Sequence, residues 1–214
     1  MTHALANGVE RNGECWRCSE RVGLSAFCVS CAAPQPIAAD VDHFALLGLP
    51  RRLDLDRADL ERRYHDASRR VHPDRHQTAS TEEQTLSLAA SAAVNRAYRT
   101  LRDPIARGRY WLELHGDPIG ADNNRVPPEL AELVFAVQEQ LADVRAGHGD
   151  AAAVAAARDA LASRLASLVA GLDDRYARHG AAHDPPALAD LKRALSAIAY
   201  VRTLLRDVDA VAAR

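Results

Sequence analysis

Apolar residues recur at helical spacing on both sides of a short polar bend, the tripeptide His72-Pro73-Asp74. Before the bend the apolar positions lie three or four residues apart, and after the bend they do so again. Two amphipathic runs joined by a short polar loop predict an antiparallel helical hairpin between Asp56 and Leu101. The apolar positions are Leu60, Tyr64, Ala67 and Val71 before the bend, and Leu86, Ala89, Ala90, Ala93, Val94, Ala97 and Leu101 after it.

Both predicted helices carry recognisable ends. Asp56 can cap the first helix, and Ser80 with Glu83 forms a capping-box pair at the start of the second. The proline of the bend restricts the preceding His72 to an extended backbone. The first helix should therefore end one residue before this histidine.

Three longer amphipathic stretches follow in the second half of the chain. They run from about 128 to 145, from a potential cap at Asp150 to about 179, and from a potential cap at Asp184 to about 210. Short connections between long helices predict antiparallel packing and hence a three-helix bundle. A short helix before the hairpin is expected to supply core residues, which are Phe44, Leu47 and Leu49. The predicted fold class is mainly α.

Composition and charge narrow the possible functions. Of the 214 residues 48% are hydrophobic and only 5% aromatic, with much of the apolar content supplied by alanine, a strong helix former. A net charge of −2 gives no general attraction to nucleic acid or to an anionic membrane. No segment reaches the roughly 18 consecutive apolar residues that a membrane span requires. Residues 1–14 carry no secretory or organellar signal, so a cytoplasmic location is expected.

All four cysteines lie near the N-terminus, as two C-x-x-C pairs with nine residues between them. Each pair can place two thiolates on a tight turn, and two facing turns form a tetrahedral four-sulfur site. Structural zinc is the favoured ion. Two disulfides, a redox-active pair and an iron or iron–sulfur centre are alternatives, although no secretion signal supports the first and no βαβ context supports the second. The predicted metal ligands are Cys15, Cys18, Cys28 and Cys31.

A His-Pro-Asp loop between two such helices resembles the J-domain, through which DnaJ-type co-chaperones act on DnaK-type ATPases. The first helix is also basic, and the segment from Asn95 to Pro104 matches the family's pattern. The resemblance implies that the tripeptide and the basic face bind the ATPase partner. Without it, the tripeptide is a helix-terminating turn and the arginines form a solvated face. The predicted chaperone-binding residues are His72, Pro73, Asp74, Arg62, Arg63, Arg69 and Arg70.

More specifically, the chain resembles the HscB-type co-chaperones of iron–sulfur cluster assembly. The segment from Arg107 to Gly116 follows the pattern by which this family leaves its J-domain. The cysteine segment looks like the extension of the mitochondrial-type members. The resemblance implies three parts: a metal-binding module with its linker at 1–39, a J-domain at 40–116, and a C-terminal three-helix bundle at 117–214.

In that family the bundle binds an IscU-type iron–sulfur scaffold protein through an apolar patch with an acidic rim. Here Glu132 and Glu139 match the rim, but the usual Leu-Met pair is absent and Ala197 takes the usual aromatic position. The alternative is that the apolar side chains only fill the bundle core. The expected scaffold contacts are Leu130, Val134, Phe135 and Val137.

The resemblance therefore implies a co-chaperone, not an enzyme. It would deliver a cluster-loaded scaffold to a DnaK- or HscA-type chaperone and stimulate that chaperone's ATPase. No paired carboxylates, nucleophile elbow or glycine-rich phosphate loop points to catalysis. Two other interpretations stay open: a general J-protein whose bundle binds other clients, and a metal-responsive regulator whose active part is the cysteine module.

Overall fold

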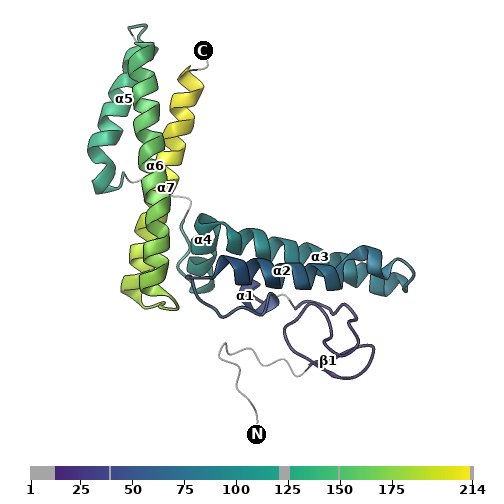
Figure 1. Ribbon diagram of the computed structural model, residues 1–214. Helices are drawn as coiled ribbons and strands as arrows, with labels where there is room; N and C mark the ends of the chain where they lie inside the picture. The colour runs from purple at the N-terminus through teal and green to yellow at the C-terminus, as the bar shows by residue number, and fades with distance from the viewer. Residues whose placement is uncertain (1–12, 39, 121–125, 149, 213–214) are drawn as a thin grey trace. The chain divides into compact units, whose positions relative to one another are not determined.

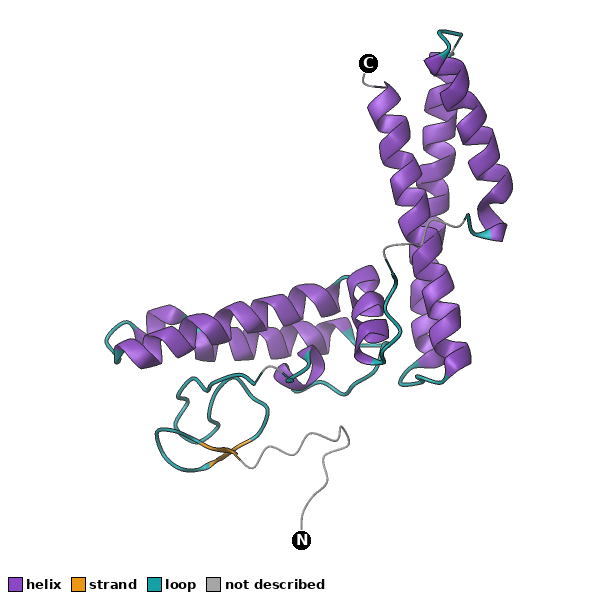
Figure 2. Cartoon of the chain, turned by 180° about the vertical axis from the view of Figure 1, so that it is seen from behind, coloured by secondary structure: helices purple, strands orange, loops and turns teal. Residues whose placement is uncertain are grey.

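The computed structural model describes residues 13–38, 40–120, 126–148 and 150–212 (Figure 1). Among these residues, helices make up nearly all the regular structure, and the strands form a small two-stranded sheet near the N-terminus (Figure 2). The predicted mainly α fold is thereby confirmed. The chain divides into two compact units, Met1–Ala106 and Arg107–Arg214. Within the described ranges, no helix combines the length and the apolar character that crossing a membrane requires.

The first unit begins with a small segment, residues 13–38, which we call the cysteine module. Strand β1 (Gly13–Glu14) pairs antiparallel with β2 (Arg21–Val22), and the first cysteine pair lies in the turn between them. The second pair lies between Phe27 and Pro34, which form an isolated antiparallel bridge. Such a small core cannot hold a fold without a cross-link. The buried core of the module consists of Cys15, Cys28 and Ala33.

The first unit continues with α1 (His43–Leu46) and the predicted hairpin of α2 (Arg57–Val71) and α3 (Thr81–Arg102). The Asp56 carboxylate and the Ser80 hydroxyl each accept a backbone N–H from the residue three positions on, at 2.7 and 3.2 Å. Both predicted N-caps are therefore confirmed. Helices α1 and α2 both contact α3. The buried side chains include the three predicted core residues and others of the hairpin: Phe44, Leu47, Leu49, Leu60, Val71, Val94 and Leu101.

The second unit contains the predicted three-helix bundle. Helices α5 (Ala131–Arg145), α6 (Ala151–His179) and α7 (Pro185–Ala212) lie side by side in both views, and each contacts the other two (Figures 1 and 2). A 3₁₀ turn, Pro128–Leu130, leads into α5. The bundle core consists of aliphatic residues from all three helices and from this turn: Leu130, Val134, Val137, Leu141, Val154, Leu161, Ala197, Val201, Leu204 and Val208.

The division between the units falls within α4 (Pro104–Leu114). From Arg107 onwards this helix belongs to the second unit, where the Arg107 guanidinium lies 4.8 Å from the ring centroid of Tyr176 in α6. Trp111, one turn further along α4, is buried. The second unit thus starts at Arg107, ten residues before the boundary at 117 that the sequence suggests. The cysteine module belongs to the same unit as the hairpin.

Candidate functional site

The His-Pro-Asp tripeptide forms a tight turn at the end of α2. His72 has an extended backbone (φ −63°, ψ 130°), as expected for a residue before proline, and α2 ends at Val71. Pro73 opens a short 3₁₀ helix, η1 (Pro73–His76), and the His72 Nδ1 atom accepts the Asp74 N–H at 3.3 Å. The side chains of His72 and Asp74 are 51% and 73% exposed. The turn therefore presents an imidazole and a carboxylate to solvent on a fixed backbone.

Buried polar side chains of η1 and α3 fix this turn to the end of α2. The His76 ring is buried, with Nδ1 3.0 Å from Glu83 Oε1 and Nε2 3.3 Å from the Arg70 carbonyl oxygen. The Ser87 hydroxyl of α3 donates to the Val71 carbonyl at 2.8 Å. The last carbonyls of a helix have no partner within it, so these two contacts satisfy groups that would otherwise be unpaired. The last turn of α2 is fixed to α3 in this way.

Sequence reasoning missed this supporting network. The sequence predicts a capping box between Ser80 and Glu83, and the Glu83 backbone N–H does donate to the Ser80 hydroxyl oxygen. Its carboxylate, however, binds His76 instead of reaching back to the cap, so only one half of the capping box is confirmed. His76 and Glu83 lie on either side of the second helix start, and their side chains can meet only if the loop folds back. No local rule specifies such a contact.

The basic face of α2 is partly neutralised by its own carboxylates. Five arginines share the helix with three acidic residues. Arg62 and Arg63 both pair with Asp59, and Arg63 also donates to the Gly48 carbonyl, so Arg63 holds the segment after α1 in place. Arg69 pairs with Asp66. Exposed pairs of this kind contribute little to stability, so these arginines stay available to a stronger partner.

Arg70 differs from the other arginines of α2. Its guanidinium carbon lies 4.7 Å from the ring centroid of Phe27, an aromatic residue of the cysteine module. No carboxylate within the described ranges pairs with it. An arginine over an aromatic face is held in place by a cation–π interaction while keeping its N–H donors free.

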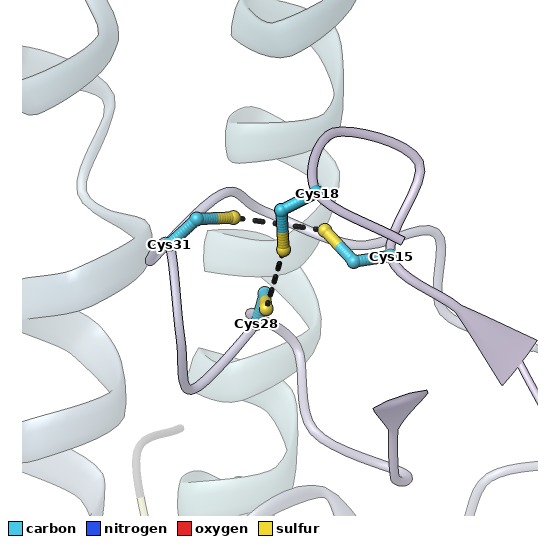
Figure 3. A group of neighbouring side chains, drawn as sticks. All are labelled: Cys15, Cys18, Cys28 and Cys31. Carbon is cyan, nitrogen blue, oxygen red and sulfur yellow. Dashed lines mark hydrogen bonds between the residues drawn. The ribbon is translucent and has the colours of Figure 1, made fainter. Parts of the chain in front are cut away.

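The four cysteine sulfurs converge on one point, as Figure 3 shows. Cys15 and Cys31 sulfurs lie 3.6 Å apart, Cys18 and Cys28 sulfurs 3.7 Å apart, and all four are within 4.8 Å of one another. A tetrahedron with metal–sulfur bonds of ~2.3 Å has edges of about 3.8 Å, so the donor set and its spacing fit a four-thiolate metal site. All four cysteines are free, which excludes the two-disulfide alternative in this structure.

The surroundings of the thiols favour thiolates at the buried positions. Burial raises the pKa of the Cys15 thiol, but the backbone amides of Arg17 and Cys18 and neighbouring thiols outweigh it, lowering the pKa to about 6. The backbone amide of Cys31 likewise lowers the pKa of Cys28. For Cys18, the backbone amide of Glu20 lowers the pKa, but burial and the three neighbouring thiols raise it to about 12. A bound cation would remove this mutual repulsion.

The expected scaffold contacts, on α5 and on the 3₁₀ turn before it, divide into two groups. Leu130, Val134 and Val137 are 1%, 7% and 1% exposed and belong to the bundle core, so they are not accessible to a partner in this structure. These three are therefore core residues and not surface contacts: Val134 and Val137 share one side of α5, and Leu130, at the end of the 3₁₀ turn before α5, packs in the same core. Phe135 points the other way and is 74% exposed. Glu132 and Glu139 are exposed on its side of α5.

Comparison with known proteins places this architecture in a family. Residues 42–110 match the DnaJ domain. The co-chaperone protein HscB homolog of Ralstonia nicotianae is 36% identical over 176 residues, covering 79% of this chain and 93% of the relative. This chain belongs to the HscB co-chaperone family. The iron–sulfur cluster co-chaperone protein HscB homolog of Arabidopsis thaliana is 30% identical over 134 residues, covering 63% of this chain and 53% of that relative.

Solved HscB structures share the fold. Human co-chaperone protein HscB matches with a TM-score of 0.69 at 26% identity, covering 92% of this chain and 98% of that chain. HscB from Vibrio cholerae matches with a TM-score of 0.54 at 29% identity, covering 80% and 97%. The DnaJ-domain match includes the whole of α2, η1 and α3. The predicted J-domain of an HscB co-chaperone is therefore confirmed.

Proposed function

We propose that this HscB-family protein presents an iron–sulfur cluster scaffold protein to a DnaK-type chaperone and stimulates the ATPase activity of that chaperone. The observation that carries the proposal is the His72–Asp74 turn, which is exposed at its tip and hydrogen-bonded below to α2 and α3. Such a preorganised turn loses little conformational entropy when it binds. The name of the Arabidopsis thaliana relative, an iron–sulfur cluster co-chaperone, supplies the cluster context.

The turn and the neighbouring arginines form the proposed chaperone-docking surface. His72, Pro73 and Asp74 would contact the nucleotide-binding domain, with the Asp74 carboxylate accepting hydrogen bonds from a cationic side chain there. Arg69 and Arg70 lie in the last turn of α2, next to the tripeptide, and Arg62 and Arg63 about two turns further back. Exposed charges steer an encounter and are screened by salt. Association should therefore weaken as ionic strength rises.

The proposed scaffold-binding surface is centred on Phe135. A large exposed aromatic side chain is the kind of residue that dominates binding energy once a partner covers it. Glu132 and Glu139 lie one turn before and after it and would form an acidic rim that selects a basic partner surface. Leu130, Val134 and Val137 would act indirectly, by holding α5 in the bundle.

The cysteine module is proposed to hold a structural zinc ion through Cys15, Cys18, Cys28 and Cys31. Four thiolates make a closed site, which cross-links the two turns and leaves no open position for a reaction. The buried Gln35 amide donates to Cys15 Sγ at 3.3 Å and would keep that ligand oriented. We assign the protein no catalytic activity of its own. The cytoplasmic location stays a prediction.

The test is steady-state ATP hydrolysis by the cognate DnaK-type chaperone, with this protein and the scaffold each present or absent. Stimulation that needs both proteins supports the proposal. Asp74→Asn should return hydrolysis to the unstimulated rate, because it removes one charge and keeps the side-chain shape. Asp173→Asn, an exposed aspartate of α6, is the matched control and should leave stimulation unchanged.

Two outcomes would contradict the proposal in different ways. Full stimulation by Asp74→Asn would overturn the role of the turn. Stimulation that ignores the scaffold would keep the chaperone partner and favour a general J-protein with other clients.

A further inference from the structure

We propose that the cysteine module positions the chaperone-docking end of the J-domain, through an ion-pair network under the His-Pro-Asp turn and an aromatic contact beside it. The positioning residues are Arg17 and Phe27 of the module. The inference rests on the proposed function, because it assumes that this turn and Arg70 bind a chaperone. The module's own buried core consists of Cys15, Cys28 and Ala33, and two side-chain contacts at its edge reach the docking end of the J-domain.

The first contact runs from the module to the turn through Glu83. Glu83 Oε1 lies 3.0 Å from His76 Nδ1 and 3.5 Å from Arg17 Nη1. The Glu83 side chain is only 11% exposed and that of His76 only 9% exposed. A carboxylate this far from water needs its hydrogen-bonding partners, since leaving a buried charge unpaired is costly. Arg17 thus completes the partner set of a residue that lies beneath the turn.

The same network reaches the turn through His76. This residue ends η1, two positions after Asp74. One ring nitrogen faces the Glu83 carboxylate and the other faces the Arg70 carbonyl, so the ring is fixed from both sides. If the Glu83 side chain moved, His76 would lose one of its two hydrogen-bonding contacts, and η1, which ends at His76, would be held less firmly.

The second contact is the Phe27 ring against the Arg70 guanidinium, at 4.7 Å. Arg70 precedes the tripeptide by two residues, and its carbonyl is the one that His76 binds. A guanidinium resting on an aromatic face has fewer available rotamers, so Phe27 reduces the entropy that Arg70 loses on binding a partner. Both contacts therefore end on Arg70 or on the turn that follows it.

Both module residues lie next to metal ligands in sequence. Arg17 lies between Cys15 and Cys18, and its backbone N–H donates to Cys15 Sγ at 3.4 Å. Phe27 immediately precedes Cys28. Anything that fixes the four sulfurs fixes these two side chains relative to the hairpin, and loss of the sulfur cluster releases both. The module would then act on the chaperone without touching it.

The test uses the full chain with Arg17→Gln and Phe27→Leu, singly and together. Each single change should raise the concentration of this protein that gives half-maximal ATPase stimulation by about two- to fivefold, the range expected for one half-exposed ion pair or one cation–π contact. The maximal stimulation should stay unchanged, because the docked turn is the same. Phe27→Tyr keeps an aromatic face under Arg70 and should behave as wild type.

Amide hydrogen exchange supplies a readout independent of activity. Exchange at residues 72–77 should accelerate in Arg17→Gln and in Glu83→Gln, while exchange in α6 stays as in the wild type. Metal content and thiol accessibility of Arg17→Gln should match those of the wild type, which shows that the module is still folded.

The outcomes separate this inference from the proposed function. Unchanged exchange at 72–77 together with an unchanged half-maximal concentration would overturn the inference and leave the chaperone assignment standing. A second outcome is that exchange at 72–77 is faster in the variants but the wild-type protein stimulates no DnaK-type ATPase. This result would support the positioning role of the module and overturn the docking role of the turn.

Discussion

The same substitution, glycine to alanine, should have opposite effects on stability at two helical positions of the second unit. At Gly108 in α4, an added Cβ would lie 2.5 Å from the Tyr176 hydroxyl oxygen and 3.0 Å from Leu195 Cδ1. Real Cβ atoms do not approach a heavy atom this closely, and Tyr176 is 1% exposed, so it cannot swing out of the way. At Gly171 in α6, the nearest atom is the flexible end of Arg175, at 3.3 Å.

The magnitudes follow from two opposing effects. Alanine in a helix interior is favoured over glycine by about 1 kcal/mol. Gly171→Ala should keep most of this gain, because the Arg175 guanidinium can move by a few tenths of an ångström. Gly108→Ala adds a methyl group to a filled site, which costs about 1–3 kcal/mol and outweighs the gain. We therefore expect Gly171→Ala to stabilise the protein and Gly108→Ala to destabilise it.

Trp111 provides the assay, since it is buried one turn away from Gly108 on the same helix. The chain contains two tryptophans, so a Trp16→Phe background makes Trp111 the only fluorophore of its kind. Urea unfolding followed by its fluorescence then reports on the second unit alone. This matters because a chain with two compact units need not unfold in one step.

A double-mutant cycle identifies the clash. A Tyr176→Phe background removes the hydroxyl oxygen, which is the closest atom. Gly108→Ala should then lower the free energy of unfolding by less than in the wild type, with a coupling energy of at least about 0.5 kcal/mol. If Gly108→Ala instead stabilises the protein as much as Gly171→Ala does, α4 does not pack against Tyr176 and the assignment of its second half to the bundle is wrong.

Three further predictions concern the bundle and the metal site. Phe135→Ala should weaken scaffold binding while changing the free energy of unfolding by less than ~0.5 kcal/mol, whereas Leu130→Ala, in the 3₁₀ turn before α5, should lower it by about 2–5 kcal/mol. Equal changes in unfolding free energy, measured by calorimetry, would refute the division of this segment into a core side and a partner side. Burial raises the pKa of Asp190, but His179 and Arg175 outweigh it and hold the pKa below its usual range. Its stabilising contribution is thus present above the unfolded-state pKa of about 3.9 and is lost as pH falls further, so Asp190→Asn should flatten the acid limb of a stability–pH curve. Removing bound metal with a chelator should raise Trp16 solvent exposure without changing Trp111 fluorescence; a loss of structure at both would show that the module supports the whole fold.

The helices and the turn were predictable because their determinants are local. The Asp56 and Ser80 caps, the restriction that Pro73 places on His72 and the helical spacing of apolar residues all act within a few positions of sequence. The structure confirms each of them. The four-cysteine cluster was predictable for the same reason, since each C-x-x-C pair forms its own turn.

The supporting network was not predictable, because its members meet only in the folded chain. Arg17 and Glu83 lie 66 positions apart in sequence, and Ser87 reaches the Val71 carbonyl across the hairpin. Their partners depend on how the module and the two helices pack, and no periodic pattern encodes that packing. Glu83 shows the consequence: the local rule identified its backbone role, and tertiary structure gave its carboxylate another one.

Helix α5 shows a different limit, since its apolar residues do not all lie on one side. Val134 and Phe135 are adjacent in sequence, so at 100° per residue they cannot both face the core. The identities of the two residues do not decide which is buried, because valine and phenylalanine are both suited to burial. The polar neighbours do decide: Phe135 shares its face with Glu132 and Glu139, which cannot enter an apolar core without partners. The apolar residue on the acidic face is therefore the one that remains for a partner to cover, and this position, rather than the number of apolar residues, makes Phe135 the centre of the proposed scaffold-binding surface.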